Sequence, residues 1–102
     1  MSIRKQYIKG KSSCRVTFRI DETIRNAAKK AHLVGEFNGW SPTAQPMRRT
    51  KTGGFAATID LPRGKEYQFR YLLDQQRWEN DPDADKLAPT PYADSQNSVV
   101  VV

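Results

Sequence analysis

The feature that most constrains the fold of this chain is a two-residue alternation of apolar and polar side chains. It is clearest over residues 66–74, where one face carries Tyr67, Phe69, Tyr71 and Leu73. Residues 15–20 and 55–61 repeat the pattern. This period is typical of strands that bury one face, so the sequence predicts a sheet protein in which Arg70 lies on the less apolar face of its strand.

Turn signals separate these segments from further short strands. We expect strands over residues 31–35 and 77–79, a brief edge strand over 47–50 and a last strand over 98–102. The dipeptides Asn38-Gly39, Ser41-Pro42, Gly53-Gly54 and Gln75-Gln76 mark turns. We interpret residues 21–30 as a connection and 80–94 as an extended loop. With no convincing helix, the sequence predicts an all-β, antiparallel β-sandwich of about six to eight strands.

The length of 102 residues is that of one domain. Positive charge gathers in the first half, where twelve Lys/Arg face three acids over residues 1–51 (12 − 3 = +9). We interpret residues 1–13 as a flexible basic N-terminal tail and residues 14–102 as the sandwich. No apolar run approaches the ~20 residues of a membrane span, and the opening residues lack the apolar stretch of a signal peptide. With a single cysteine, Cys14, these features predict a cytoplasmic protein without membrane contact.

The side chains needed for catalysis or metal binding are scarce. His32, the one histidine, lies within a predicted strand, and nothing marks Cys14 as a nucleophile rather than a packing residue or a surface thiol. Residues 81–85 begin like a calcium loop, but Lys86 replaces the glycine that such a loop requires at its sixth position. We therefore expect no enzyme activity, no cofactor and no metal, and we interpret residues 81–85 as a solvated acidic loop.

The two tryptophans both follow predicted turns. Trp40 comes after Asn38-Gly39, and Trp78 follows the hairpin at Gln75-Gln76. Each indole either closes one end of the sandwich or forms part of a flat platform for a sugar ring, whose C–H face stacks on an indole while its hydroxyls seek polar side chains. Arg70 would supply hydrogen-bond donors beside Trp78.

Four segments in order resemble the family-48 carbohydrate-binding modules. They are Leu33 to Ser41, Phe55 to Gly64, Tyr67 to Pro82 and Asn97 to Val100. This family includes the glycogen-binding domain of the AMP-activated protein kinase β subunit and the early-set N-terminal domains of isoamylases and branching enzymes. The resemblance spans roughly residues 15–102 and implies an immunoglobulin-like early-set sandwich that binds α-1,4-glucan without cleaving it.

The resemblance also implies which residues bind the sugar. Its two stacking indoles fall on Trp40 and Trp78, its basic residue on Arg70, and its asparagine before the last strand on Asn97. The chain departs from the family at the hairpin 74–78, which is one residue longer and lacks glycine. Since side chains alternate in a strand, the extra residue re-aims Trp78 unless the turn absorbs it. A loop leucine of the kinase subunits falls near Ala93, which offers little contact.

Two other classes of function remain open from the sequence. One is an early-set protein-interaction domain that acts with a separate glucan-metabolising enzyme and binds sugar weakly or not at all. The other is nucleic-acid binding through the basic first half, which we do not favour because the basic tail offers only Tyr7 for stacking on bases. The sequence leaves open which glucan is bound, whether the protein acts with a partner enzyme, and its oligomeric state.

Overall fold

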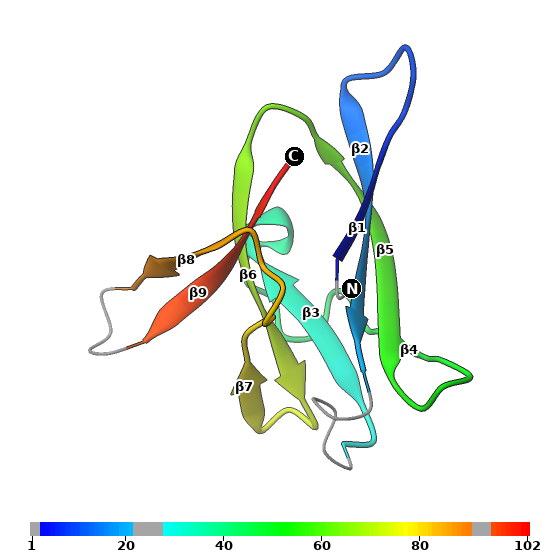
Figure 1. The fold of residues 1–102 in the computed structure, drawn as a ribbon. Coiled ribbons are helices and arrows are strands. Elements are labelled where there is room, and N and C mark those ends of the chain that lie inside the picture. Colours follow the sequence, from blue (N-terminus) through cyan, green and yellow to red (C-terminus); the bar gives the residue numbers. More distant parts are fainter. Residues whose placement is uncertain (1–2, 22–27, 91–94) are drawn as a thin grey trace.

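The computed structural model describes residues 3–21, 28–90 and 95–102, which form two antiparallel sheets packed face to face (Figure 1). The first sheet has the order β1-β2-β5-β4, and the second has the order β3-β6-β9-β8, with β7 paired to β6. The strands of the first sheet are β1 (Ile3–Tyr7), β2 (Ser13–Ile20), β4 (Arg48–Arg49) and β5 (Phe55–Pro62). Those of the second are β3 (Ala31–Gly35), β6 (Glu66–Leu73), β7 (Arg77–Glu79), β8 (Lys86–Pro89) and β9 (Gln96–Val101). The predicted all-β antiparallel sandwich is confirmed.

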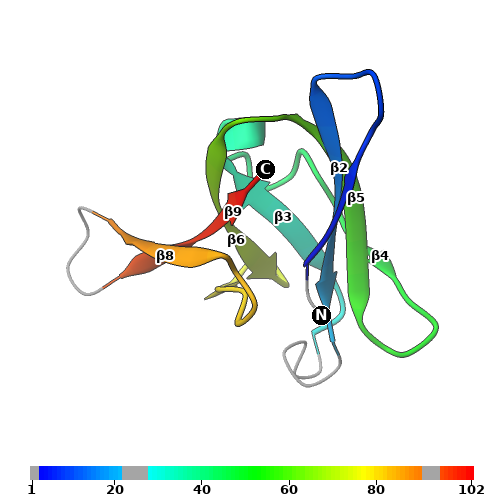
Figure 2. The same ribbon diagram turned by 45° about the horizontal axis from the view of Figure 1, so that its top comes forward.

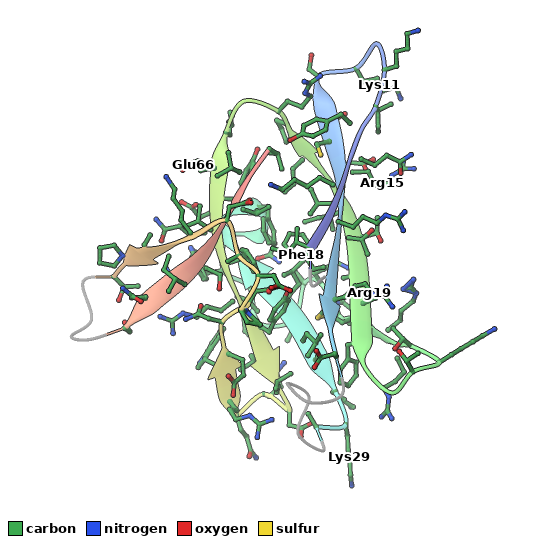
Figure 3. All side chains as sticks on the ribbon, viewed as in Figure 1. Lys11, Arg15, Phe18, Arg19, Lys29 and Glu66 are labelled. Carbon is green, nitrogen blue, oxygen red and sulfur yellow. The ribbon has the colours of Figure 1, made fainter. Side chains whose placement is uncertain are left out.

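The predicted alternation forms the core between the sheets. From β2 the core receives Val16, Phe18 and Ile20, and from β6 it receives Phe69, Tyr71 and Leu73; each is at most 1% exposed. The rings of Phe18 and Phe69 meet edge to face across the two sheets, with 5.0 Å between their centroids. In Figure 3, Phe18 points between the sheets, whereas Arg15 and Arg19 point away from them.

The prediction of a flexible tail over residues 1–13 is wrong for residues 3–7. They form β1, which pairs with β2 from Ile3 opposite Phe18 to Tyr7 opposite Cys14. Ile3 is 6% exposed and extends the core, while most of the strand is polar. The sequence does not predict this strand because its residues do not alternate: only Ile3 is buried, and the backbone of β1 pairs with β2.

The prediction of an uninterrupted loop over residues 80–94 is also wrong. Residues Lys86–Pro89 form β8, which pairs with β9 in a hairpin that extends away from the rest of the sandwich (Figure 2). The described residues therefore contain nine strands, two more than the seven segments expected from alternation and turns.

The acidic segment 81–85 is less solvated than predicted. Asp81 is 3% exposed and accepts a hydrogen bond of 2.5 Å from the hydroxyl of Tyr71 and one of 2.8 Å from the backbone N–H of Asp83. Burial raises the pKa of Tyr71 well above its usual range, so its hydroxyl remains a donor. The carboxylate of Asp85 instead pairs with Lys5 at 2.7 Å. Asp81 and Asp85 thus bond residues 81–85 to β6 and β1 of the sandwich.

Cys14 is completely buried in the core, which agrees with its interpretation as a packing residue. The connection expected over residues 21–30 lies largely outside the described residues, which omit 22–27. Among the residues that the structure describes, no helix is long and apolar enough to cross a membrane.

Candidate functional site

A groove of about 630 Å³ lies on the outer face of the second sheet. Its lining includes all four residues predicted from the sequence, and we call it the indole groove. It is lined by Glu36, Trp40, Gln68, Arg70, Trp78, Thr90, Ser95 and Asn97. Trp40 is 38% exposed and Trp78 is 47% exposed, so neither indole is buried in an end of the sandwich. The structure thus places both rings on one side of the molecule.

A tight turn after β3 carries Trp40 into the groove. The chain forms one short 3₁₀ turn, η1 (Glu36–Asn38), after which Gly39 adopts a left-handed φ of 65°. The side chain of Asn38 holds the turn, because its oxygen accepts from the N–H of Gly35 at 3.1 Å and its amide donates to the carbonyl of Leu33 at 2.9 Å. The expected turn at Asn38-Gly39 is therefore confirmed, and Asn38 is its anchor.

Trp40 itself has a φ of 59°. A left-handed backbone is uncommon for a bulky residue and costs of order 1–3 kcal/mol. The surrounding turn offsets this cost, since the N–H of Trp40 donates to the carbonyl of Gly35 at 2.9 Å. Trp40 therefore combines a strained backbone with a side chain that lines the groove.

Glycine at position 35 permits this turn to lie against β6. A Cβ on Gly35 would approach the carbonyl oxygen of Gln68 to 2.6 Å and the Cβ of Phe69 to 2.8 Å. Real side chains do not tolerate such distances to backbone atoms. Any larger residue would push β3 and the start of η1 away from β6, and Trp40 would move with them.

The hairpin between β6 and β7 positions Trp78. Asp74 and Gln75 both have left-handed φ values, 53° and 58°, and the N–H of Gln76 closes the turn on the carbonyl of Leu73 at 3.0 Å. Two successive left-handed residues match the twist of the flanking strands. Trp78 then stands opposite Leu72, on the same face as Arg70. The turn absorbs the extra residue, and the departure from the family pattern does not turn the indole to the other face.

Asp74 also ties this hairpin to the chain before β3. Its carboxylate accepts hydrogen bonds of 2.9 Å from the backbone N–H groups of Lys30 and Lys29. These two bonds to the ionised form lower the pKa of Asp74, the bond from Lys30 contributing most. The charged aspartate therefore stabilises the turn that precedes Trp78.

A hydrogen-bonded network fixes the polar side of the groove. The guanidinium of Arg70 donates from Nε to Asn97 Oδ1 at 2.6 Å and from Nη2 to the carbonyl of Gln96 at 2.9 Å. The amide of Asn97 in turn donates to Gln68 Oε1 at 2.9 Å. Since Arg70 and Asn97 are half-buried and mutually held, their remaining polar atoms face the groove in a defined orientation.

Sequence reasoning missed half of the lining residues. Gln68 precedes Arg70 by two positions, so the strand period alone could have placed it on the same face. Glu36 directly follows β3, and its carboxylate accepts from the backbone N–H of Gln68 at 2.6 Å. No comparable signal indicated Thr90 and Ser95, which meet at the groove from the ends of β8 and β9. Ala93, the position of the family's loop leucine, lies outside the described residues.

The chemistry of the groove suits the binding of a sugar. His32 Nδ1 lies 3.1 Å from the side-chain amide of Gln75, so the imidazole bonds to a neutral group. In the described part of the chain, no three His, Cys, Asp or Glu side chains gather in a way that could hold a metal ion. The groove itself offers two partly exposed indoles, a held guanidinium and two amides, which are the groups that recognise a sugar's apolar faces and polar edges.

Comparison with known proteins agrees with this chemistry. No curated protein matches the chain. A family defined as the glycogen recognition site of AMP-activated protein kinase matches residues 18–101, from within β2 to the end of β9. The match includes both turns that carry the indoles and every residue that lines the groove. Because it covers more than half of the chain, this protein belongs to the glycogen-recognition family of carbohydrate-binding domains.

Proposed function

We propose that the protein is a non-catalytic module that binds α-1,4-glucan in the indole groove by stacking sugar rings on Trp40 and Trp78. The observation that carries this proposal is the meeting of both exposed indoles with Arg70 and Asn97 in one groove. Membership of the glycogen-recognition family supports the choice of ligand.

The polar side of the groove would orient the sugar. The Arg70 guanidinium keeps N–H donors beyond the two that bond to Asn97 and Gln96. Such donors suit the ring and hydroxyl oxygens of a glucose unit. Because the network is already formed, little side-chain entropy would be lost on binding.

An order-of-magnitude estimate gives a weak site. If each indole removes about 50 Å² of apolar sugar surface from water, the two contribute roughly 2–3 kcal/mol. Two or three net hydrogen bonds of about 1 kcal/mol each bring the total to about 5 kcal/mol. This corresponds to a Kd of roughly 0.1–1 mM for a short glucan. A glycogen particle presents many such sites, so weak binding still localises a protein on it.

The first prediction tests the indoles directly. Trp40→Ala and Trp78→Ala should each abolish retention on immobilised glycogen or amylose in affinity electrophoresis, because each removes about half of the stacking surface. The matched control is Tyr7→Ala, which removes an exposed aromatic ring from β1 and should leave retention unchanged. Circular dichroism establishes that each variant is folded.

Two results would contradict the proposal. One is unchanged retention in both tryptophan variants. The other is a wild-type chain that ignores every glucan yet co-purifies with a glucan-metabolising enzyme, which would instead support the protein-interaction role. Titration of the wild type with maltoheptaose or β-cyclodextrin, followed by tryptophan fluorescence, separates these cases, because the chain has no indoles besides Trp40 and Trp78.

A further inference from the structure

A second groove, of about 540 Å³, lies on the outer face of the first sheet. Its charged lining comes from three strands and the turn after β4, and we call it the arginine groove. The five cations are Arg4, Arg19, Arg48, Arg49 and Lys51. Among the described residues, the remaining lining consists of threonines and one alanine, without a carboxylate or an aromatic ring.

The register of the first sheet builds this groove. Arg19 on β2 stands opposite Ala56 on β5, and Ala56 stands opposite Arg48 on β4, so all three side chains share one face. With neighbouring strands about 4.8 Å apart, the Cα atoms of the two arginines are about 10 Å apart across the small alanine. Arg4 on β1 reaches the same face opposite Thr17. Arg4, Arg19 and Arg48 therefore lie on one face of the sheet, and the small side chain of Ala56 leaves space between Arg19 and Arg48.

The charge of this groove is not balanced within the described part of the chain. None of its five cations forms an ion pair there, whereas Arg15 pairs with Asp60, and Lys5 with Asp85. Arg49 has an aromatic contact, with its guanidinium carbon 5.5 Å from the centroid of Phe55. Gathering like charges on one sheet face is unfavourable unless a bound anion neutralises them.

Carboxylates mark the limits of the basic surface. Asp60 lies farther along β5, where it pairs with Arg15 at 3.0 Å. On the β1 side, Asp83 and Asp85 line a neighbouring hollow that Arg4 and Arg19 also border. A long polyanion such as a nucleic-acid duplex would have to cross these carboxylates, whereas a short acidic segment would fit between them.

We propose that the arginine groove docks a short acidic segment of a partner protein, rich in aspartate or glutamate. Guanidinium groups bind carboxylates through paired hydrogen bonds, and the threonine hydroxyls of the lining add neutral contacts. No aromatic ring is found among the described lining residues, which disfavours single-stranded nucleic acid because it stacks its bases on such rings. The two sheets turn their outer faces in opposite directions (Figure 1), so this groove is distinct from the indole groove. A glucan and a protein could then be held together by one domain.

The probe for this site is a fluorescein-labelled peptide of five glutamates, titrated with the full chain at low ionic strength by fluorescence anisotropy. The groove variant combines Arg19→Gln, Arg48→Gln and Lys51→Gln. We expect it to bind the peptide about tenfold more weakly than the wild type, since three exposed ion pairs are lost.

The matched control combines Lys9→Gln, Lys11→Gln and Lys65→Gln, which removes the same charge from exposed positions outside the groove. It should change peptide affinity no more than about twofold. Circular dichroism establishes that both variants are folded. Three results would overturn the proposal: a wild-type chain that does not bind the peptide, equal losses in the two variants, and tighter binding of a ten-base-pair DNA duplex that shows the same dependence on the groove residues.

Discussion

At the scale of single residues, the hydrogen bond between Arg70 and Asn97 fixes the orientation of the polar groups in the groove. Arg70 donates a hydrogen bond of 2.6 Å to Asn97, and the amide of Asn97 donates a further bond to Gln68. A guanidinium without this acceptor would sample many rotamers and would lose that freedom on binding. Under the proposed function, these polar residues would contribute by being held in position as well as by contacting the sugar.

Asn97→Ala should therefore weaken maltoheptaose binding by about fivefold, which corresponds to one lost hydrogen bond of about 1 kcal/mol. The thermal midpoint should change little, because the residue lies at the surface of the sheet. The matched control is Gln96→Ala, which removes an adjacent exposed amide but keeps the carbonyl that Arg70 uses. Fluorescence titration measures the affinities, and a loss of affinity as large in the control would show that Asn97 has no special part.

At the scale of elements, β1 gives the N-terminal residues 3–7 a structural role in the first sheet. As a strand it covers the edge of β2 and places Ile3 in the core. An uncovered β2 would present a long unpaired edge, which invites association with other chains. The segment is therefore part of the domain rather than an appendage.

Ile3→Ala should lower the free energy of unfolding by about 2 kcal/mol, because it removes a buried side chain from the end of the core. A residue in a flexible tail would give no change. Urea denaturation measures the difference, with Gln6→Ala on the exposed face of the same strand as the control near zero. Equal stability of the two variants would contradict the structural role of β1.

The stability of the hairpin that carries Trp78 depends on pH through Asp74. The pKa of Asp74 is lowered in the folded protein from its usual 3.8, chiefly by the backbone N–H of Lys30. Its stabilising contribution is therefore complete above pH 3.8 and is lost as the pH falls through the lower, folded-state pKa. Asp74→Asn keeps a residue that tolerates a left-handed backbone but removes the charge.

The Asn variant should be less stable than the wild type at neutral pH, and the difference should shrink in acid below pH 3.8. Urea denaturation at a series of pH values measures this. The control is Asp60→Asn, whose wild-type carboxylate also has a lowered pKa, owing to Arg15, but lies on the other sheet. Both variants should show the acid effect, but only Asp74→Asn should also weaken maltoheptaose binding, because only Asp74 supports Trp78.

For the whole molecule, one packed core separates the indole groove from the arginine groove. The core rings of Phe18 and Phe69 lie between the sheets, and the two grooves occupy the outer faces. Ligands on opposite sides of such a core couple only if one of them changes the packing. The described residues show one packing of this core.

We therefore expect maltoheptaose and the glutamate peptide to bind independently. Saturation with one should change the Kd of the other by less than about twofold, and both should be held at once. Anisotropy titration of the peptide with and without maltoheptaose measures this. A larger change would show that the two faces communicate.

Alternation and turn chemistry are local properties, so they were enough to predict the sheet class, the inward faces of β2, β5 and β6, and the turn at Asn38. The folded structure was needed to show that β1 and β8 are strands, because each is defined by its pairing with β2 or β9 and not by an alternation of its own residues. The same holds for the groove: Trp40 and Trp78 come together because β3 and β7 both pair with β6. That proximity depends on register between distant segments, a property of the folded chain that local patterns do not contain.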